Sequence, residues 1–312
     1  MRSTRVRWVR ATLLAAAVLL AAAWTPGAWA AATRTFETPE QAVESLIAAI
    51  RKGDNKEILA ILGPQAKTLV SSGDPVADRA LGERFVRDYD VSHSLKAGGG
   101  KIVLITGDDQ FPFAIPVVPD GPRWRFDTAA GKEEIENRRI GRNELDAVQV
   151  CLAYVDAQRE YYTQARMGDG VQQYARRTAS TAGKRDGLYW DVKPGDPPSP
   201  LGPLVASARA EGYGPRVKGR PAAYHGYYYR VLEGQGPQAP GGAYAYVANG
   251  RMIGGFALIA FPAQYGVSGV MTFMVNHDGM VYQKDLGRRT ATLARQINTF
   301  DPDPTWQKVA TE

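Results

Sequence analysis

The chain has 312 residues, of which 44% are hydrophobic and 22% charged, a composition typical of a folded globular protein. Its formal charge of +6 falls to +2 once the four arginines of an N-terminal leader are set aside. A surface that follows nucleic-acid phosphates needs a clustered basic excess, so we expect no nucleic-acid partner. A single cysteine excludes an internal disulfide, and stability must therefore come from the hydrophobic core.

Residues 1–30 have the pattern of a secretory signal peptide. A basic leader precedes an apolar run at 11–23, which is short for a membrane span of about 20 residues. Ala28 and Ala30 are small residues at the positions that a signal peptidase needs, so we expect cleavage between Ala30 and Ala31. The mature chain is then periplasmic or extracellular and has no stable membrane span. The alternative is a leader that is retained as an envelope anchor.

The mature chain is predicted to be α+β, with domains at residues 31–130 and 131–312. In the first domain a capping box at Thr38 starts a helix that Gly53 ends, and Asp54 and Asp74 cap two further helices. A small antiparallel sheet is expected to follow. Its strands are predicted at 101–106, 111–118 and 124–126. This order of elements loosely resembles cystatin-like and nuclear-transport-factor-like modules.

The second domain is predicted to be a long helix packed on a second antiparallel sheet. The helix is expected from about 132 to 167, with Asn143 capping its longer part and Cys151 as a buried thiol on its apolar face. Three arginines at 138, 139 and 142 lie among acidic residues and are interpreted as a solvated helix face. Residues 183–221 are rich in Gly, Pro and Asp and have no long apolar run, and KPGDPPSPLGP at 193–203 is predicted to be a long loop. Strands are predicted at 224–232, 256–261, 270–275 and 280–283.

The segment Asn276-His277-Asp278-Gly279 raises the question of an active site. Asp-Gly between two apolar runs is a strong hairpin signal, because a tight turn needs a positive φ that Gly adopts freely. His277 has no His or Cys at zinc-like spacing. We therefore interpret the segment as a turn, and we expect no catalytic residue, no metal site and no cofactor in the chain.

Aromatic residues crowd the C-terminal half of the chain. In the predicted strand at 224–232, side-chain alternation places His225, Tyr227 and Tyr229 on one face and Tyr224, Tyr228 and Arg230 on the other. One face must pack, and the other is free to present rings to a sugar, a peptide or another protein. The candidate binding residues are Tyr189, Trp190, Tyr224, His225 and Tyr228. The alternative is that the tyrosines only cover the sheet, with their hydroxyl groups in water.

Long phrases of the chain resemble a family of exported bacterial proteins that is catalogued as domain of unknown function 2950. They include IENRRIGRNELDAVQVCLAYVDAQREYY at 135–162, DGLYWDV at 186–192, SPLGPLVASA at 199–208, YHGYYYRVLEGQGPQAPGGAYAYVANGRMIGGFALIAFPAQYGVSGVMTF at 224–273 and DGMVYQKDLG at 278–287. The resemblance implies export and brings no established reaction, cofactor or site residue. More weakly, the helix, loop, strand and hairpin of the second domain are similar to the heads of pilin-like proteins.

These observations predict an exported, non-catalytic module of the bacterial envelope that binds an envelope protein or a glycan. The alternative is a hydrolase that acts on a cell-wall or extracellular polymer. Its residues would be His225 or His277 together with Asp278 or Asp285. That alternative requires a histidine within about 3 Å of a carboxylate inside a cleft.

Overall fold

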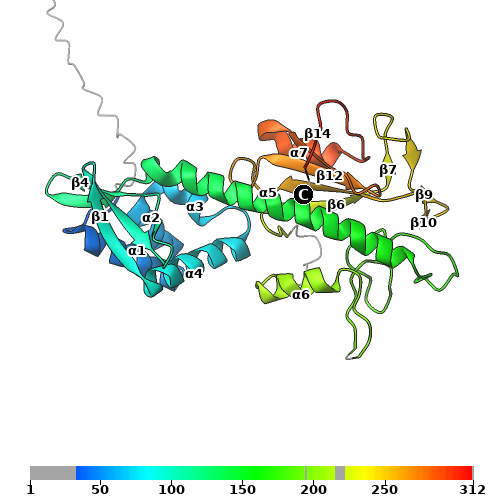
Figure 1. The fold of residues 1–312 in the computed structure, drawn as a ribbon, viewed down its shortest axis with the longest axis horizontal. Coiled ribbons are helices and arrows are strands. Elements are labelled where there is room, and N and C mark those ends of the chain that lie inside the picture. The colour runs from blue at the N-terminus through cyan, green and yellow to red at the C-terminus, as the bar shows by residue number, and fades with distance from the viewer. Residues whose placement is uncertain (1–32, 194, 215–221, 311–312) are drawn as a thin grey trace, which may run out of the picture. The chain divides into compact units, whose positions relative to one another are not determined.

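A computed structural model describes residues 33–193, 195–214 and 222–310 of the chain. The predicted signal peptide and its cleavage site between Ala30 and Ala31 lie outside these residues. Over the described part the protein is α+β, with helices first, a small sheet next, and then a long helix with a second sheet (Figure 1). None of the helices in this part has the length and apolar character that a membrane crossing requires.

Two capped helices open the chain as the sequence predicts. Helix α1 (Pro39–Lys52) begins at Thr38, whose side chain accepts a hydrogen bond from the Gln41 amide, and it ends at Gly53 with φ +64°. The Gln41 side chain accepts from the amide of Glu37 instead of from that of Thr38, so the capping box reaches one residue further back. Helix α2 (Asn55–Leu62) has Asp54 as its cap. Three unpaired backbone amides are thereby satisfied.

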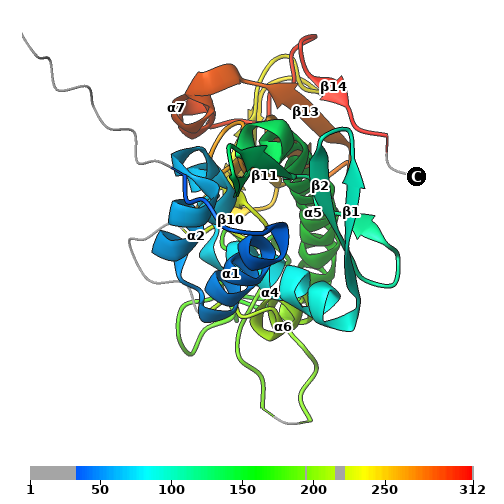
Figure 2. The ribbon, with the colours of Figure 1, turned by 90° about the vertical axis from the view of Figure 1, so that its left-hand side faces the viewer.

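Helix α4 (Pro75–Val91) follows the short turns η1 (Pro64–Ala66) and α3 (Lys67–Val70), which the sequence pattern did not predict. The first sheet is antiparallel, with order β1-β2-β4-β5 and β3 paired to β2. Its strands are β1 (His93–Gly98), β2 (Lys101–Thr106), β3 (Phe111–Pro112), β4 (Val117–Asp120) and β5 (Arg123–Phe126). Figure 2 shows α1, α2 and α4 together with β1 and β2. The helices and the sheet share one core, which includes Leu46, Ile61, Leu104 and Phe126.

Strand β1 was missed in the sequence, and the predicted strand at 111–118 is two strands. β1 is polar and largely exposed, so it has no hydrophobic alternation by which to recognise it. Between β3 and β4, the backbone amide of Phe113 bonds to the carbonyl of Leu104, and the chain then turns before Val117. Pro112 and Pro116 supply no amide donor to a ladder, which explains the break.

Helix α5 (Thr128–Tyr162) is a single 35-residue helix. At about 1.5 Å per residue it extends for roughly 50 Å. The prediction that Asn143 caps the longer part of this helical segment is wrong: its side-chain amide donates to the carbonyl of Ser268 at 2.9 Å from inside the helix. Arg139 is buried rather than solvated, and its guanidinium donates to the carbonyls of Thr68 and Leu69 at the end of α3.

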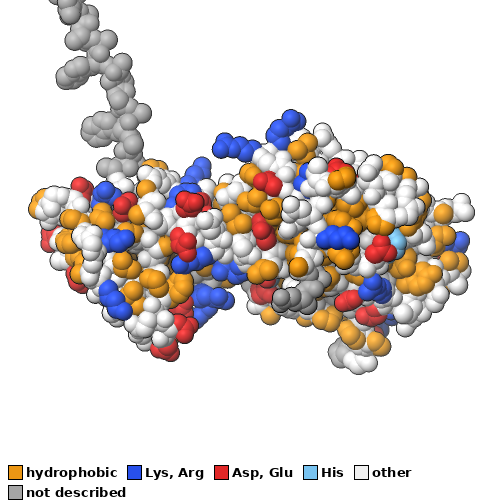
Figure 3. All heavy atoms as spheres, turned by 45° about the horizontal axis from the view of Figure 1, so that its top comes forward, with side chains coloured by type: hydrophobic (Ala, Val, Ile, Leu, Met, Phe, Trp, Pro, Cys, Tyr) orange, Lys and Arg blue, Asp and Glu red, His pale blue; other side chains and the backbone are white. Residues whose placement is uncertain are grey.

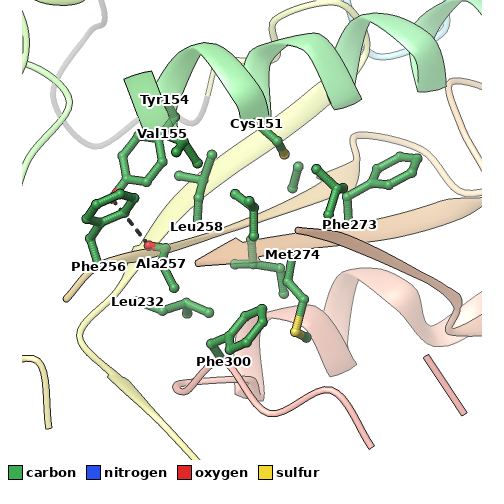
Figure 4. Close-up of a cluster of buried hydrophobic side chains, with 14 of the residues drawn as sticks. Cys151, Tyr154, Val155, Leu232, Phe256, Ala257, Leu258, Phe273, Met274 and Phe300 are labelled. Carbon is green, nitrogen blue, oxygen red and sulfur yellow. Dashed lines mark hydrogen bonds between the residues drawn. The ribbon is translucent and has the colours of Figure 1, made fainter. Parts of the chain in front are cut away.

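The second sheet is antiparallel, with order β14-β13-β12-β11-β6. Its strands are β6 (Tyr227–Leu232), β11 (Ala257–Pro262), β12 (Met271–Asn276), β13 (Val281–Asp285) and β14 (Gln307–Lys308). Strand β11 is buried along its whole length, as its continuous apolar run predicts, because α5 and α7 (Thr290–Gln296) both contact it. Figure 4 shows Cys151, Tyr154 and Val155 of α5 among the sheet side chains. The Tyr154 hydroxyl reaches the carbonyl of Ala257 at 3.3 Å.

Short elements complete this half of the chain. The loop predicted at 193–203 is irregular where it is described, up to the start of a helix, α6 (Gly202–Ala210), which the sequence did not predict. Strands β7 (Gly234–Gln235) and β8 (Tyr244–Ala245) form one small ladder. Strands β9 (Val247–Ala248) and β10 (Arg251–Met252) form another. The β9–β10 loop is Asn249-Gly250 with φ +50° and +78°, the primed turn that this residue pair favours.

Substitution by alanine at two glycines of α5 is predicted to change the stability of the fold in opposite directions. A Cβ on Gly131 would lie 2.2 Å from the carbonyl oxygen of Ala114, whereas a Cβ on the exposed Gly141 would meet nothing within 4 Å. We expect Gly131→Ala to destabilise the fold by about 2 kcal/mol or more, because two backbones must separate. We expect Gly141→Ala to stabilise it by about 0.5–1 kcal/mol through helix propensity. Urea unfolding followed by circular dichroism measures both, and equal effects of the two substitutions would contradict the packing at Gly131.

Candidate functional site

A cavity of about 1090 Å³ lies beside strand β6, which is the terminal strand of the second sheet. Its walls come from β6 and β11, from α6, and from irregular segments around residues 178–193. Figure 1 shows α6 and β6, two of the elements that line it. The aromatic lining residues are Tyr154, Tyr189, Trp190, Tyr213, Tyr224, Tyr228, Tyr229 and Phe261. The basic ones are Lys184, Arg185, Lys193, Arg209, Arg230 and Arg295, against the acidic Asp191 and Asp196.

Four of the five predicted binding residues line this cavity, although they come from different parts of the chain. Tyr189 and Trp190 lie in the irregular segment before α6, Tyr224 precedes β6, and Tyr228 belongs to β6. His225 does not line the cavity but lies directly behind Tyr224, with the two ring centroids 4.1 Å apart. The structure therefore brings the aromatic candidates to one place.

The alternation predicted for 224–232 holds only from Tyr227 onward. His225 has a φ of +50° and Gly226 a φ of +75°, and Tyr224 and Tyr227 exchange backbone hydrogen bonds across this turn. A positive φ at a non-glycine residue interrupts an extended strand. The prediction that His225 shares a strand face with Tyr227 and Tyr229 is therefore wrong.

Tyr228 and Arg230 lie on one face of β6. The Tyr228 ring packs against Phe261 of β11, with centroids 5.7 Å apart. One terminal nitrogen of Arg230 donates to the carbonyls of Ala294, at 2.9 Å, and Ile297 at the end of α7. Burial lowers the pKa of Arg230 from its usual value. The partial negative charge at the C-terminal end of α7 stabilises the positive charge of its guanidinium. The helix end thus fixes a guanidinium at the cavity wall.

Two aromatic rings of the lining, those of Tyr189 and Trp190, have arginine guanidinium groups next to them. The Tyr189 hydroxyl donates to Asp191 at 2.6 Å, and Arg209 of α6 bonds the same carboxylate at 3.4 Å while its guanidinium lies 5.3 Å from the Tyr189 ring centroid. The Trp190 ring has Arg166 at 5.3 Å and Arg185 at 5.5 Å from its centroid. Such contacts are worth about 0.5–1 kcal/mol each at exposed sites. They orient the rings without filling the cavity.

His225 connects α5 to the C-terminal end of α6. Its Nε2 lies 2.6 Å from the Glu211 carboxylate, and its Nδ1 lies 2.9 Å from the Asp146 carboxylate. The Nδ1 contact is an ion pair that departs from hydrogen-bond alignment. Burial by itself lowers the pKa of His225, but the negatively charged carboxylates of Asp146 and Glu211, each within 3 Å of a ring nitrogen, outweigh it and raise the pKa to about 9. The imidazole is therefore positively charged at neutral pH.

A buried carboxylate, Asp74, supports the same region. One oxygen caps α4 by accepting from the amides of Val76 and Ala77. The other accepts from the Tyr213 hydroxyl at 2.8 Å and the Gly226 amide at 2.9 Å. The Tyr213 hydroxyl in turn accepts from the His225 amide at 3.2 Å, and burial together with the Asp74 charge raises the pKa of Tyr213. Asp74 thus has a donor for each of its oxygens, as a buried charge requires.

The segment Asn276–Gly279 is a turn, as predicted. The Gly279 amide bonds to the Asn276 carbonyl, and the Asn276 side chain bonds to the backbone and carboxylate of Asp278. Only Gly279 has a positive φ, so the turn is not the primed type that the Asp-Gly pair suggests. The His277 ring packs edge-on against Tyr246 and Phe256, and its nearest carboxylate atom, on Asp278, is 3.8 Å from Nε2. Asp285 bonds the Tyr265 hydroxyl and the Gly287 amide instead of a histidine.

Within the described ranges, no group of three His, Cys, Asp or Glu side chains is placed to hold a metal ion. Asp146 and Glu211 flank different nitrogens of the His225 ring, so these carboxylates face the ring from separate directions. Cys151 is fully buried, and burial raises its thiol pKa to about 12, so it is not a reactive thiolate at neutral pH. On the face displayed in Figure 3, basic and acidic side chains are interspersed.

The structure adds site residues that were not among the candidate binding residues of the sequence. Asp74, Asp146, Glu211, Tyr213 and Arg230 all act near the cavity, yet they are widely separated along the chain. The one available signal was the capping pattern Asp74-Pro75, which predicts a local role and gives no indication of a distant partner. Pairings of this range depend on tertiary contacts.

Comparison with known proteins gives one match, to the family described as "Protein of unknown function (DUF2950)", whose model covers residues 33–309. The comparison with curated proteins and the comparison with solved structures gave no match. The pilin-like resemblance of the C-terminal half is therefore still a prediction.

The ion pairs of His225 predict a pH-dependent stability. The contacts of protonated His225 with Asp146 and Glu211 raise its pKa from 6.5 to about 9. They therefore stabilise the folded state fully below pH 6.5, and this stabilisation is lost as the pH rises through 9. We expect the free energy of unfolding to fall by on the order of 1–2 kcal/mol over that interval, after discounting for partial exposure of the ring. His225→Gln should lack this fall, whereas His93→Gln, at an exposed histidine, should retain it. Urea unfolding of the three proteins at both ends of the pH range measures the difference, and parallel curves would refute the role of His225.

Proposed function

This chain belongs to the DUF2950 family of proteins of unknown function, and we propose that it is an exported, non-catalytic binding module of the bacterial envelope. The observation that carries the proposal is the cavity of about 1090 Å³ beside β6, with its aromatic and basic lining. Ligand sites are concave, mostly apolar and oriented by a few polar groups. The partner would be an envelope protein or a glycan that enters this cavity.

Several contacts show that the lining is organised before any ligand arrives. Arg230 is held by the end of α7, Tyr189 by Asp191, and Tyr228 by Phe261. Side chains that are already oriented lose less conformational entropy on binding, so more of the contact energy contributes to affinity. This arrangement supports a recognition role for the cavity.

The alternative function is a hydrolase that acts on an envelope polymer. His225 is within 3 Å of two carboxylates, but these are Asp146 and Glu211 in place of Asp278 and Asp285, and His225 does not line the cavity as this alternative requires. Both ring nitrogens face a carboxylate, and a pKa of about 9 keeps the ring protonated at neutral pH. A general base must be able to take up a proton near the working pH. The geometry therefore favours binding over hydrolysis.

Export gives a direct prediction for the N-terminus. Mass spectrometry of the protein recovered from the envelope or the culture medium should show a chain that begins at Ala31. A chain that still carries Met1 or Arg2 would indicate a retained anchor, and recovery only from the cytoplasm would contradict export.

Binding in the cavity predicts a selective effect of aromatic substitution. The mature protein, immobilised and exposed to envelope extract, should retain a ligand whose affinity falls about tenfold, or by about 1.4 kcal/mol, in Tyr228→Ala because a wall of the cavity is removed. Tyr244→Ala is the matched control, since Tyr244 is an exposed tyrosine that does not line the cavity. Equal retention by both variants would place the binding surface elsewhere. Turnover of a wall polymer that His225→Gln abolishes would establish the hydrolase instead.

A further inference from the structure

Among the strands that the structure describes, β6 has a neighbour on one side only in the second sheet, where β11 pairs with it from Tyr227 to Leu232. The cavity reaches β6 at Tyr228, Tyr229 and Arg230. Phe261 and Arg230 line it from one face of the sheet, and Leu258 and Tyr229 line it from the opposite face. A cavity that touches both faces of a terminal strand includes that strand's outer edge.

The hydrogen bonds at each end of β6 show which backbone groups point outward. At Tyr227 both the amide and the carbonyl bond to Tyr224, on the side away from β11, while the Gly226 carbonyl accepts from Ala263, next to β11. Beyond the strand, the Glu233 carbonyl accepts from the Tyr246 amide. In an antiparallel strand the amide and carbonyl of one residue point the same way, and the direction alternates along the chain. Tyr229 and Val231 therefore direct their backbone groups outward.

These outward groups form a short unpaired window. Between Tyr227 and Glu233, the described residues include no backbone partner for the amides and carbonyls of Tyr229 and Val231. The two bracketing residues are six positions apart, about 20 Å in a strand, which leaves room for an added strand of about four residues. The window can therefore form up to four backbone hydrogen bonds with an added strand, two through its amides as donors and two through its carbonyls as acceptors.

We propose that the cavity binds an extended, acidic peptide segment of a partner protein, which adds as a strand to the outer edge of β6. The inference rests on the proposed binding function and specifies its ligand class. Main-chain hydrogen bonds to a sheet edge supply affinity, and alternate side chains enter pockets on either face. Here one set of side chains meets Tyr228, Arg230 and Phe261, and the other meets Tyr229 and Leu258.

The charge of the lining selects an acidic segment. Six Lys and Arg side chains line the cavity against two Asp, and Asp191 already pairs with Arg209. Arg230 uses one terminal nitrogen on the carbonyls of α7, and Arg295 follows Ala294 directly in the same helix. These two cations thus belong to one end of the cavity. Carboxylates on the peptide would complement them and raise the association rate at low salt.

The test uses a seven-residue, N-acetylated peptide of alternating Glu and Val and the full mature chain. Binding of the fluorescently labelled peptide is measured by fluorescence anisotropy. We expect its affinity to fall about tenfold when Lys replaces Glu, and we expect binding to be lost when every peptide nitrogen is methylated. Hydrogen exchange followed by NMR should show slower exchange at the amides of Tyr229 and Val231 when the peptide is present. A peptide concentration of about 1 mM would detect a binding free energy as weak as about −4 kcal/mol. Absence of binding at this concentration overturns the proposal.

A variant pair tests the edge itself. Val231→Pro removes the outward amide and leaves the inward bonds of β6 to β11, whereas Val231→Ala keeps the amide and removes only side-chain volume. Proline is tolerated on an edge strand where its nitrogen faces away from the ladder. We expect Val231→Pro to bind the peptide about tenfold more weakly than Val231→Ala. Circular dichroism of both variants verifies folding, and the methylated peptide keeps the test valid if the proline variant fails to fold.

The outcomes separate this inference from the proposed function. Equal binding of the methylated and unmethylated peptides would show that β6 pairing is not used. A glycan that binds the cavity and is not displaced by the peptide would overturn the peptide class and leave the binding function standing. If no ligand binds the protein more weakly after Tyr228→Ala, both the peptide inference and the proposed binding function of the cavity are overturned.

Discussion

The fold depends on burying two parts of one helix, α5, against two different hydrophobic cores. A 35-residue helix with a mixed surface is not stable alone in water, since most helical stability in proteins comes from packing. Its first half contributes Ile135 to the core around the first sheet, and its second half contributes residues from Ala147 to Tyr161 to the core under the second sheet. Between them, Arg139 and Asn143 bond distant backbone carbonyls from buried positions. The rest of the structure is arranged on this shared helix.

The candidate site uses the same helix and is stabilised mainly by charges. Asp146 of α5 and Glu211 beyond α6 hold His225, and Asp74 holds Tyr213 and Gly226. Each buried or partly buried charge has an opposite charge or several donors, without which its desolvation would be costly. The network determines where Tyr224 and Tyr213 stand at the cavity, although neither His225 nor Asp74 lines it. Charged groups outside the cavity thus position part of its aromatic surface.

Local signals in the sequence predicted local structure well. Caps at Thr38, Asp54 and Asp74 and the stop at Gly53 lie where the pattern placed them, because capping involves residues within one turn of each other. The polar strand β1 and the helix α6 were missed, since neither has a clear hydrophobic period. Asn143 was misassigned as a cap, because the same side chain serves a cap or a distant carbonyl, and sequence shows only its type.

The sequence by itself determined the α+β class, the family, the capped helices, the buried strand β11 and the turn at Asn276–Gly279. These follow from short-range periodicity and from phrases that can be recognised as they stand. The sequence also singled out four of the aromatic residues that line the cavity, Tyr189, Trp190, Tyr224 and Tyr228, but without showing where they lie. Only the tertiary structure decided that they line one cavity beside β6, and that His225 lies outside the strand and pairs with Asp146 and Glu211. Contacts between residues far apart in the chain depend on how the elements pack, which no local pattern contains.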